Sequence, residues 1–301
     1  MSVRGIKSIT TSEPTLEGAG VHLRRGFGFG KTTEFDPFLL FDDFRGDRPQ
    51  DYSAGFPWHP HRGIETITYV LAGEVEHRDS LGNRGVMGPG DIQWMTAGSG
   101  IIHQEMPEGD AQGRMHGFQL WANLPSSLKM TKPRYQDIKT EEISEITEDD
   151  GTRVRVLCGD FWGKKGPVEG VAADPRYLDI FIPSGVTRRL PVEVDRHAFA
   201  YVFEGKGYFH QASAPQGVLV EDLATDVVSR AIPTENRHLI LFDQGDEVVV
   251  TGGEGGFRFL LASGRPLGEP VAWHGPIVMN TQEEIREAVR DLQKGTFLRN
   301  V

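Results

Sequence analysis

Two short motifs concentrate metal-binding side chains in the first half of this chain. His59 and His61 are separated by one residue, and so are His103 and Glu105. On a β-strand, residues two apart point to the same side. If two such strands face each other, three imidazoles and one carboxylate surround one point. The spacing therefore predicts a metal site built from His59, His61, His103 and Glu105.

The donor set limits which metals suit this site. Imidazole and carboxylate without thiolate fit Fe(II), Mn(II), Ni(II), Cu(II) or Zn(II), and do not fit an iron–sulfur cluster. Four protein ligands on an octahedral ion leave two positions open for a substrate or O2. A structural zinc site would be closed and usually rich in thiolate. The pattern therefore favours a metal that takes part in chemistry.

Other polar residues compete for the same assignment. Glu65 lies four residues after His61 and would share its face if the strand stayed regular. We interpret Glu65 as an acceptor for an imidazole N–H rather than as a ligand. His77 and His116 are interpreted as ordinary polar residues. The alternative to a metal site is a set of separate surface or capping histidines.

Short strands must position these motifs. Period-two alternation and turn residues (Gly 37, Pro 18) predict an all-β chain that folds as a small antiparallel β-barrel or β-sandwich. The expected strands are 65–71, 75–78, 92–95 and 116–123 in the first half, and 178–182, 198–203, 238–242, 247–251 and 257–262 in the second.

The acidic stretch 141–150 is the expected boundary between an N-terminal barrel, residues 1–140, and a C-terminal barrel, residues 141–301. One helix, residues 281–294, closes the second barrel. Thr281 with Glu284 forms a capping box, and Gly295 follows as the C-cap.

The two halves contain similar short segments. Thr68–Gly73 is echoed by Ala200–Gly205, which suggests two copies of one barrel with an insertion within 211–236 in the second. The second half has neither histidine motif, so we expect its barrel to lack metal ligands.

Charge and composition exclude several classes of function. The formal net charge is −11, which disfavours direct contact with nucleic acid. The single cysteine, Cys158, excludes an intrachain disulfide and a cysteine-based zinc site. The first residues lack the apolar stretch of a signal peptide, and no membrane-spanning run of apolar residues occurs. These features predict a cytoplasmic protein with no membrane partner, and the length suggests a monomer.

Longer blocks around the motifs resemble those of the pirin family in the cupin superfamily. They are Phe38–Phe44, Gly55–Thr66, Thr96–Glu105 and the late segment Ala262–Pro270. The resemblance covers nearly the whole chain and implies a bicupin fold (two double-stranded β-helix, or jelly-roll, barrels) with metal in the N-terminal barrel only. The four family ligands fall on His59, His61, His103 and Glu105. Glu65 matches the glutamate of the general cupin motif, whereas pirins take their carboxylate ligand from the second motif.

The resemblance also implies a cofactor and an activity. The usual pirin metal is iron, expected here as one Fe(II), with Mn, Ni, Co, Cu or Zn as alternatives. Several pirin-like proteins are similar in site to quercetin 2,3-dioxygenase, so the expected partners are a flavonol-like aromatic substrate and O2. Glu105 would accept the proton of the metal-bound hydroxyl.

The main alternative is a non-enzymatic, redox-responsive iron protein that binds a protein partner as a transcriptional cofactor, with a nuclear location in a eukaryote. A third is a metal enzyme of another class, such as an isomerase.

Overall fold

The computed structural model describes residues 2–211 and 230–298. These fall into two compact units. One, here named the site unit, comprises residues 13–142, 170–173 and 267–298. The other, the companion unit, comprises residues 2–12, 143–169, 174–211 and 230–266. In the described part of the chain, no helix is both long enough and apolar enough to cross a membrane.

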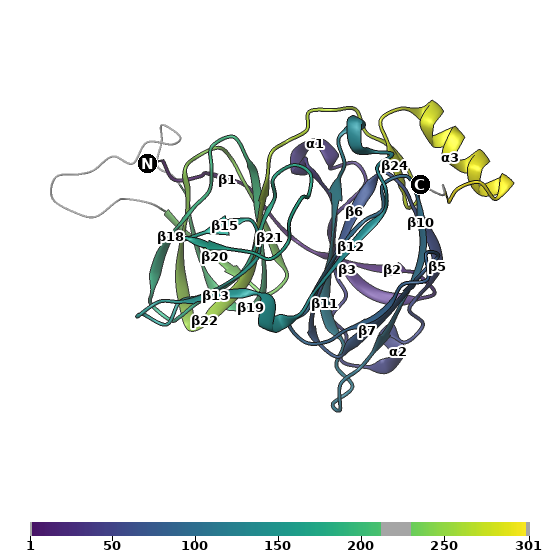
Figure 1. Cartoon of the computed structure of the whole chain (residues 1–301). Coiled ribbons are helices and arrows are strands. Elements are labelled where there is room, and N and C mark those ends of the chain that lie inside the picture. Colours follow the sequence, from purple (N-terminus) through teal and green to yellow (C-terminus); the bar gives the residue numbers. More distant parts are fainter. Residues whose placement is uncertain (1, 212–229, 299–301) are drawn as a thin grey trace. The chain divides into compact units, whose positions relative to one another are not determined.

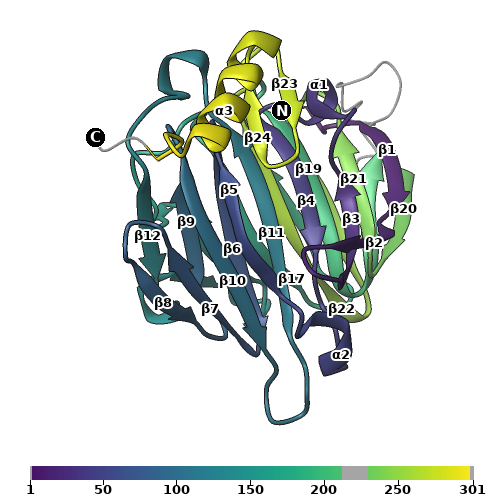
Figure 2. The same cartoon turned by 90° about the vertical axis from the view of Figure 1, so that its right-hand side faces the viewer.

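The site unit contains two antiparallel sheets that pack face to face (Figures 1 and 2). In the described residues, one sheet runs in the order β12 (Arg134–Ile138), β9 (Ile92–Thr96), β6 (Ile64–Ala72), β11 (His116–Asn123), β4 (Phe38–Asp43), β3 (Val21–Phe27) and β2 (Glu13–Glu17). The other runs in the order β5 (Phe56–His61), β10 (Ile101–Glu108), β7 (Glu74–Asp79) and β8 (Arg84–Met87). Between them lies an apolar cluster that includes Leu23, Val70, Val75 and Met87.

Three helices and one hairpin complete what is described of the site unit. They are α1 (Thr32–Phe35), α2 (Pro49–Tyr52), α3 (Gln282–Lys294) and the hairpin β23 (Ala272–His274)–β24 (Ile277–Met279). The 3-10 turns are Ser126–Leu128 and Thr140–Glu142. Helix α3 lies beside β24 in both views and buries Ile285 and Ala288 there (Figures 1 and 2). Its predicted capping box is present, and Gly295 ends it with a φ of 70°.

The companion unit holds one large antiparallel sheet. Its described strands follow the order β1 (Ile6–Thr11), β21 (His238–Phe242), β19 (His197–Gln211), β22 (Glu247–Gly264), β17 (Arg176–Ile182), β14 (Arg153–Cys158) and β13 (Ser144–Thr147). β18 (Thr187–Pro191) pairs with β22, β20 (Arg230–Glu235) pairs with β19, and β15 (Asp160–Phe161) pairs with β16 (Lys164–Lys165). The long strands β19 and β22 change partners along their length, so the sheet curls around one apolar core.

The predicted strands are present, and the protein is mostly β with two domains. Two details of the sheets differ from the expectation. The sheets are open rather than closed by hydrogen bonds among the described strands. Segments 247–251 and 257–262 are parts of one strand, β22, although Gly255 and Gly256 between them have φ values of 81° and 77°.

The predicted division at residue 140 also differs from the observed units, at both ends of the chain. Strand β1 belongs to the companion unit because it pairs with β21. The last segment, with helix α3, belongs to the site unit, since the Val278 N–H donates to the Arg62 carbonyl at 3.1 Å. Short-range sequence patterns carry no information on either long-range pairing.

Candidate metal centre

Strand register brings the two histidine motifs together. β5 and β10 are hydrogen-bonded neighbours rather than opposing strands, and His59 is paired directly with His103. Residue 101 is paired with His61, so both motifs present their side chains on one face of the four-stranded sheet. On the other side of β10, Glu105 is paired with His77 of β7. The site is therefore built on three adjacent strands.

The three predicted histidines converge. One ring nitrogen from each of His59, His61 and His103 lies within 4.8 Å of the others. The Nε2 atoms of His59 and His61 are 3.1 Å apart, and the rings of His59 and His103 are 4.4 Å apart between centroids. This is the only such cluster of three or more potential ligands in the part of the chain that the structure describes.

Hydrogen bonds fix the tautomers of two of these rings. The Nδ1–H of His59 donates to the Pro57 carbonyl at 2.8 Å, and that of His61 donates to the Pro276 carbonyl at 3.1 Å. A carbonyl oxygen only accepts, so each Nδ1 carries a proton, and in a neutral ring the Nε2 atom then presents a lone pair. Two lone pairs that face each other at 3.1 Å repel unless a cation lies between them.

Burial keeps two of the rings neutral. His61 and His103 are almost fully enclosed, at 2% and 1% exposure. Desolvation, together with the neighbouring imidazoles, holds the pKa of each well below its usual value. Neither ring nitrogen of His103 has a hydrogen-bond partner among the described residues. Neutral imidazoles with unpartnered nitrogens suit a transition metal, and the donor set fits the ion that the sequence predicts.

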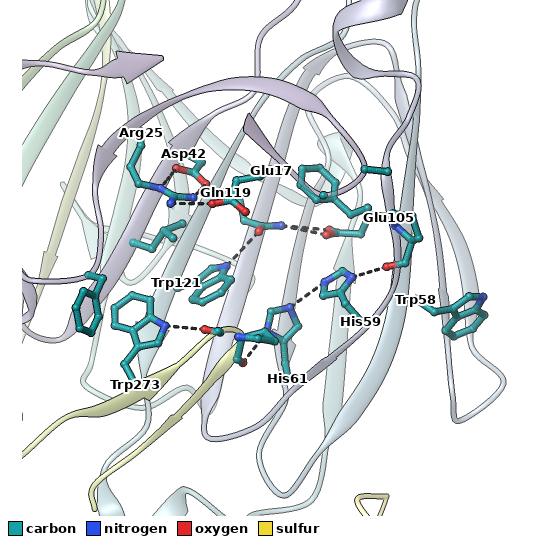
Figure 3. Close-up of a pocket in the computed structure, with 18 of the residues that line it drawn as sticks. Glu17, Arg25, Asp42, Trp58, His59, His61, Glu105, Gln119, Trp121 and Trp273 are labelled. Atoms are coloured by element: carbon teal, nitrogen blue, oxygen red, sulfur yellow. Dashed lines mark hydrogen bonds and ion pairs between the residues drawn. The ribbon is translucent and has the colours of Figure 1, made fainter. Parts of the chain in front are cut away.

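Glu105, the fourth predicted ligand, lines a cavity that His59 and His61 also line. It stands outside the group formed by the three histidines. The Thr68 hydroxyl donates to Glu105 Oε1 at 3.2 Å, and the Gln119 amide donates to both carboxylate oxygens at 3.3 and 3.2 Å. The Trp121 indole N–H in turn donates to Gln119 Oε1 at 3.1 Å. These donors hold the carboxylate from the opposite sheet, and Figure 3 shows the bonds made by Gln119 and Trp121.

Gln119 and Thr68 belong to a polar row that crosses the inner face of the seven-stranded sheet. Its members are paired strand by strand in the order Asp137, Gln93, Thr68, Gln119, Asp42 and Arg25. The Arg25 guanidinium forms a two-pronged ion pair with Asp42, at 2.9 and 2.8 Å. Desolvation raises the pKa of Asp42 to about 6 even though Arg25 opposes the shift. A polar row inside a β-sandwich is costly to bury, which indicates a functional surface.

Gln119, Asp42 and Arg25 of this row line one cavity together with His59 and His61. Its volume is about 760 Å³, a size typical of sites for small organic molecules. Its wall includes Trp121 and Trp273, whose rings are stacked with centroids 5.9 Å apart. Phe29 meets Trp273 edge-on at 5.8 Å. Figure 3 shows His59 and His61 pointing toward one another in this cavity, whereas Trp58 points away. The site thus combines a cluster of potential metal-binding nitrogens with an aromatic wall.

The expected role of Glu65 as an acceptor for an imidazole is wrong. Its Oε1 accepts from the Thr96 hydroxyl at 2.7 Å, on the face of β6 away from Thr68 and the cavity. The cause is Gly63, which separates β5 from β6 with a φ of 79° and sends the two strands into different sheets. The regular alternation from His61 to Glu65 is therefore broken.

The other histidines differ in how well they match expectation. His116 lies outside the cavity and is 2.7 Å from the Asp47 carboxylate, as an ordinary polar residue would be. His77 was expected to be equally ordinary, yet it is 2% exposed with its ring 5.2 Å from that of His103. Most of the predicted insertion, 211–236, lies outside the described residues.

Sequence reasoning missed the residues that support Glu105 and form the far wall. Gln119 and Trp121 alternate with apolar residues along β11, and this inward polar position was an available signal. Arg25 and Asp42 carried no comparable signal, because their pairing depends on the register of β3 with β4. Trp273 lies more than 100 residues further along the chain and reaches the cavity through the hairpin β23–β24.

Two family models match the chain. The model named Pirin matches residues 20–122, and the model of the pirin C-terminal cupin domain matches residues 177–298. All four predicted ligand residues lie within the first match.

Relatives and solved structures match over nearly the full length. A pirin-like protein of Caulobacter vibrioides is 45% identical, over 99% of this chain and all of the relative. A Pseudomonas aeruginosa protein, named as a candidate quercetin 2,3-dioxygenase, is 40% identical over 98% of each chain. The crystal structure of a quercetin 2,3-dioxygenase from Acinetobacter baumannii has a TM-score of 0.84 and 29% identity, and the match covers 98% of this chain and 99% of that one.

Proposed function

Because this chain belongs to the pirin family, we propose that it is a metal-dependent dioxygenase of the quercetin 2,3-dioxygenase type, which opens a flavonol ring with O2 and releases carbon monoxide. The observation that carries the proposal is the convergence of His59, His61 and His103 beside a cavity with an aromatic wall. Similarity to the Acinetobacter baumannii enzyme over the whole chain supports it.

His59, His61, His103 and Glu105 would hold one divalent transition metal, with Fe(II) as the expected ion. When bound, such an ion acts as a Lewis acid toward the flavonol hydroxyl and as a partner for O2. The carbonyls of Pro57 and Pro276 keep the Nδ1 protons of His59 and His61 in place, so that their Nε2 atoms remain ligands.

The protein's own residues then bind the substrate and move its proton. The rings of Trp121 and Trp273 offer an aromatic surface to a planar flavonol. A carboxylate oxygen of Glu105 accepts the proton of the substrate hydroxyl. Thr68 and Gln119 keep that carboxylate aimed into the cavity before and after it takes the proton.

The test is turnover by the metal-loaded protein. Protein loaded with Fe(II) without oxygen is mixed with quercetin and O2, and loss of the flavonol absorbance is followed together with carbon monoxide release. We expect His61→Ala and Glu105→Ala to abolish both signals, while His116→Ala, which removes an imidazole outside the cavity, keeps them. No turnover with any of the candidate metals and several flavonols would contradict the proposal. It would favour the non-enzymatic alternative.

A further inference from the structure

We propose that Asp42, Glu17 and Arg25 form a subsite that binds the hydroxyl groups of a neutral planar polyphenol at the end of the cavity away from the histidines. All three residues line the cavity, and Figure 3 shows Asp42 and Arg25 at the opposite end from His61. The inference rests on the proposed function and names the part of the same site that selects the substrate.

The charge of this subsite is negative. Arg25 donates from Nε and Nη2 to the two oxygens of Asp42 and from Nη1 to Glu17 Oε1, at 2.9, 2.8 and 2.9 Å. One guanidinium is thus shared by two carboxylates. The only other charged residue among the described lining residues is Glu105. Arg25 is therefore already neutralised by its own neighbours, and a substrate carboxylate would meet net negative charge.

The carboxylates retain capacity to accept hydrogen bonds. Each carboxylate offers about four lone-pair directions, and Arg25 uses one on each oxygen of Asp42. The Asp42 side chain is only 8% exposed, so a donor that reaches it is shielded from water. Phenolic O–H groups are neutral donors. This end of the cavity therefore favours a polyphenol over an aromatic acid.

Sheet geometry gives the distance between the subsite and the reacting end. Gln119, which donates to Glu105, is paired across β11 and β4 with Asp42, and Asp42 is paired across β4 and β3 with Arg25. Neighbouring strands are about 4.8 Å apart, so the backbone positions of Asp42 and Arg25 lie about 5 and 10 Å from that of Gln119 across the sheet. That is the length of two or three fused or linked rings.

The wall along this path is aromatic. Trp121, Trp273 and Phe29 follow one another at centroid distances of 5.9 and 5.8 Å. Apolar and edge or face contacts with these rings would hold a flat ring system along the row. A molecule that places one hydroxyl at Glu105 would then carry its remote hydroxyls to Asp42 and Glu17.

Binding without oxygen tests the subsite independently of turnover. Metal-loaded protein is titrated with three flavonols, and binding is followed by quenching of tryptophan fluorescence. The flavonols are quercetin, galangin, which lacks the phenyl-ring hydroxyls, and the quercetin analogue that lacks the 5- and 7-hydroxyls of the fused rings. We expect at least one of the last two to bind about ten-fold more weakly than quercetin, since a hydrogen bond to a carboxylate contributes roughly that factor. Asp42→Asn should reduce this preference to about two-fold or less.

Two further variants make the test decisive. Asp43→Asn removes a carboxylate that pairs with Arg45 on the outer face of the same strand, so it should keep the preference. Glu17→Gln, at a side chain 42% exposed, should lower the preference about three-fold even if Asp42→Asn fails to fold. Equal affinity for all three flavonols in the wild type, or equal effects of Asp42→Asn and Asp43→Asn, would overturn the subsite and leave the proposed function standing. No flavonol binding at all would overturn both.

Discussion

Replacing Lys129 with methionine is expected to destabilise the site unit strongly. Lys129 is 1% exposed, and its ammonium donates to the carbonyls of Gly63 and Val278 at 2.8 and 2.9 Å and to Asn123 Oδ1 at 2.5 Å. It thus ties the turn after His61 to strand β24. Methionine preserves the volume of the side chain but removes all three donors.

The magnitude follows from the oxygens left behind. An unpartnered buried acceptor costs about 1–3 kcal/mol, and the two main-chain carbonyls cannot turn away as the Asn123 amide can. Lys129→Met should therefore lower the free energy of unfolding by about 4 kcal/mol. A loss of this size is a large fraction of the stability of a typical domain.

Urea unfolding followed by tryptophan fluorescence measures this loss. Four of the five tryptophans, at 58, 94, 121 and 273, lie in the site unit, so the signal reports mainly on it. Lys139→Met is the matched control, because Lys139 lies in the same unit and donates to the Val86 carbonyl and Asp91 but is half-exposed. The control should cost less than about 1 kcal/mol. A loss no greater for Lys129→Met than for Lys139→Met would refute this reasoning.

Three other perturbations probe the centre. Gln119→Leu removes the amide donors of the proposed carboxylate ligand, so metal affinity, measured by competition with a chelator, should fall about 10-fold or more. Burial lowers the pKa of His61 and His103, so the unfolded chain binds more protons than the native protein below about pH 6.5. The unfolding free energy of metal-free protein should then fall with decreasing pH, by up to about 1.4 kcal/mol per pH unit for each ring. Gly63→Ala should cost more than about 2 kcal/mol in urea unfolding, because its φ is 79° and a Cβ there would lie 2.0 Å from a carbonyl of β24.

Each of these has a control or a contradicting outcome. Gln104→Leu changes the residue next to Glu105, on the other face of β10, and should leave metal affinity unchanged. An equal loss in both variants would contradict the role of Gln119. A pH slope that persists after His61→Gln and His103→Gln would show that other groups cause it. Gly82→Ala has a φ of 89° with open space around its Cβ, so an equal cost there would mean that the carbonyl contact at Gly63 is unimportant.

Local patterns in the sequence predict much of the fold and part of the site. Alternation identifies the strands, and Thr281 with Glu284 identifies the start of α3, because both signals depend on neighbouring residues. The spacing of His59, His61 and His103 predicts their convergence, since period two fixes the face of a strand.

The rest depends on pairing between distant segments. Strand β1 belongs to the companion unit and helix α3 to the site unit because of long-range contacts, and local residue spacing does not reveal these contacts. Gly63 shows the limit of the alternation rule, because one positive φ moves Glu65 to the opposite face. The row from Asp137 to Arg25 exists only once the strand order is known.

The most direct test of the central claim is a crystal structure of the Fe(II)- or Ni(II)-loaded protein with diffraction recorded at the absorption edge of the metal. We expect one anomalous peak within about 2.0–2.3 Å of the Nε2 atoms of His59 and His61, of a ring nitrogen of His103 and of a carboxylate oxygen of Glu105. A fully loaded protein whose metal peak lies away from these histidines, or whose ion is not bound by Glu105, would contradict the account.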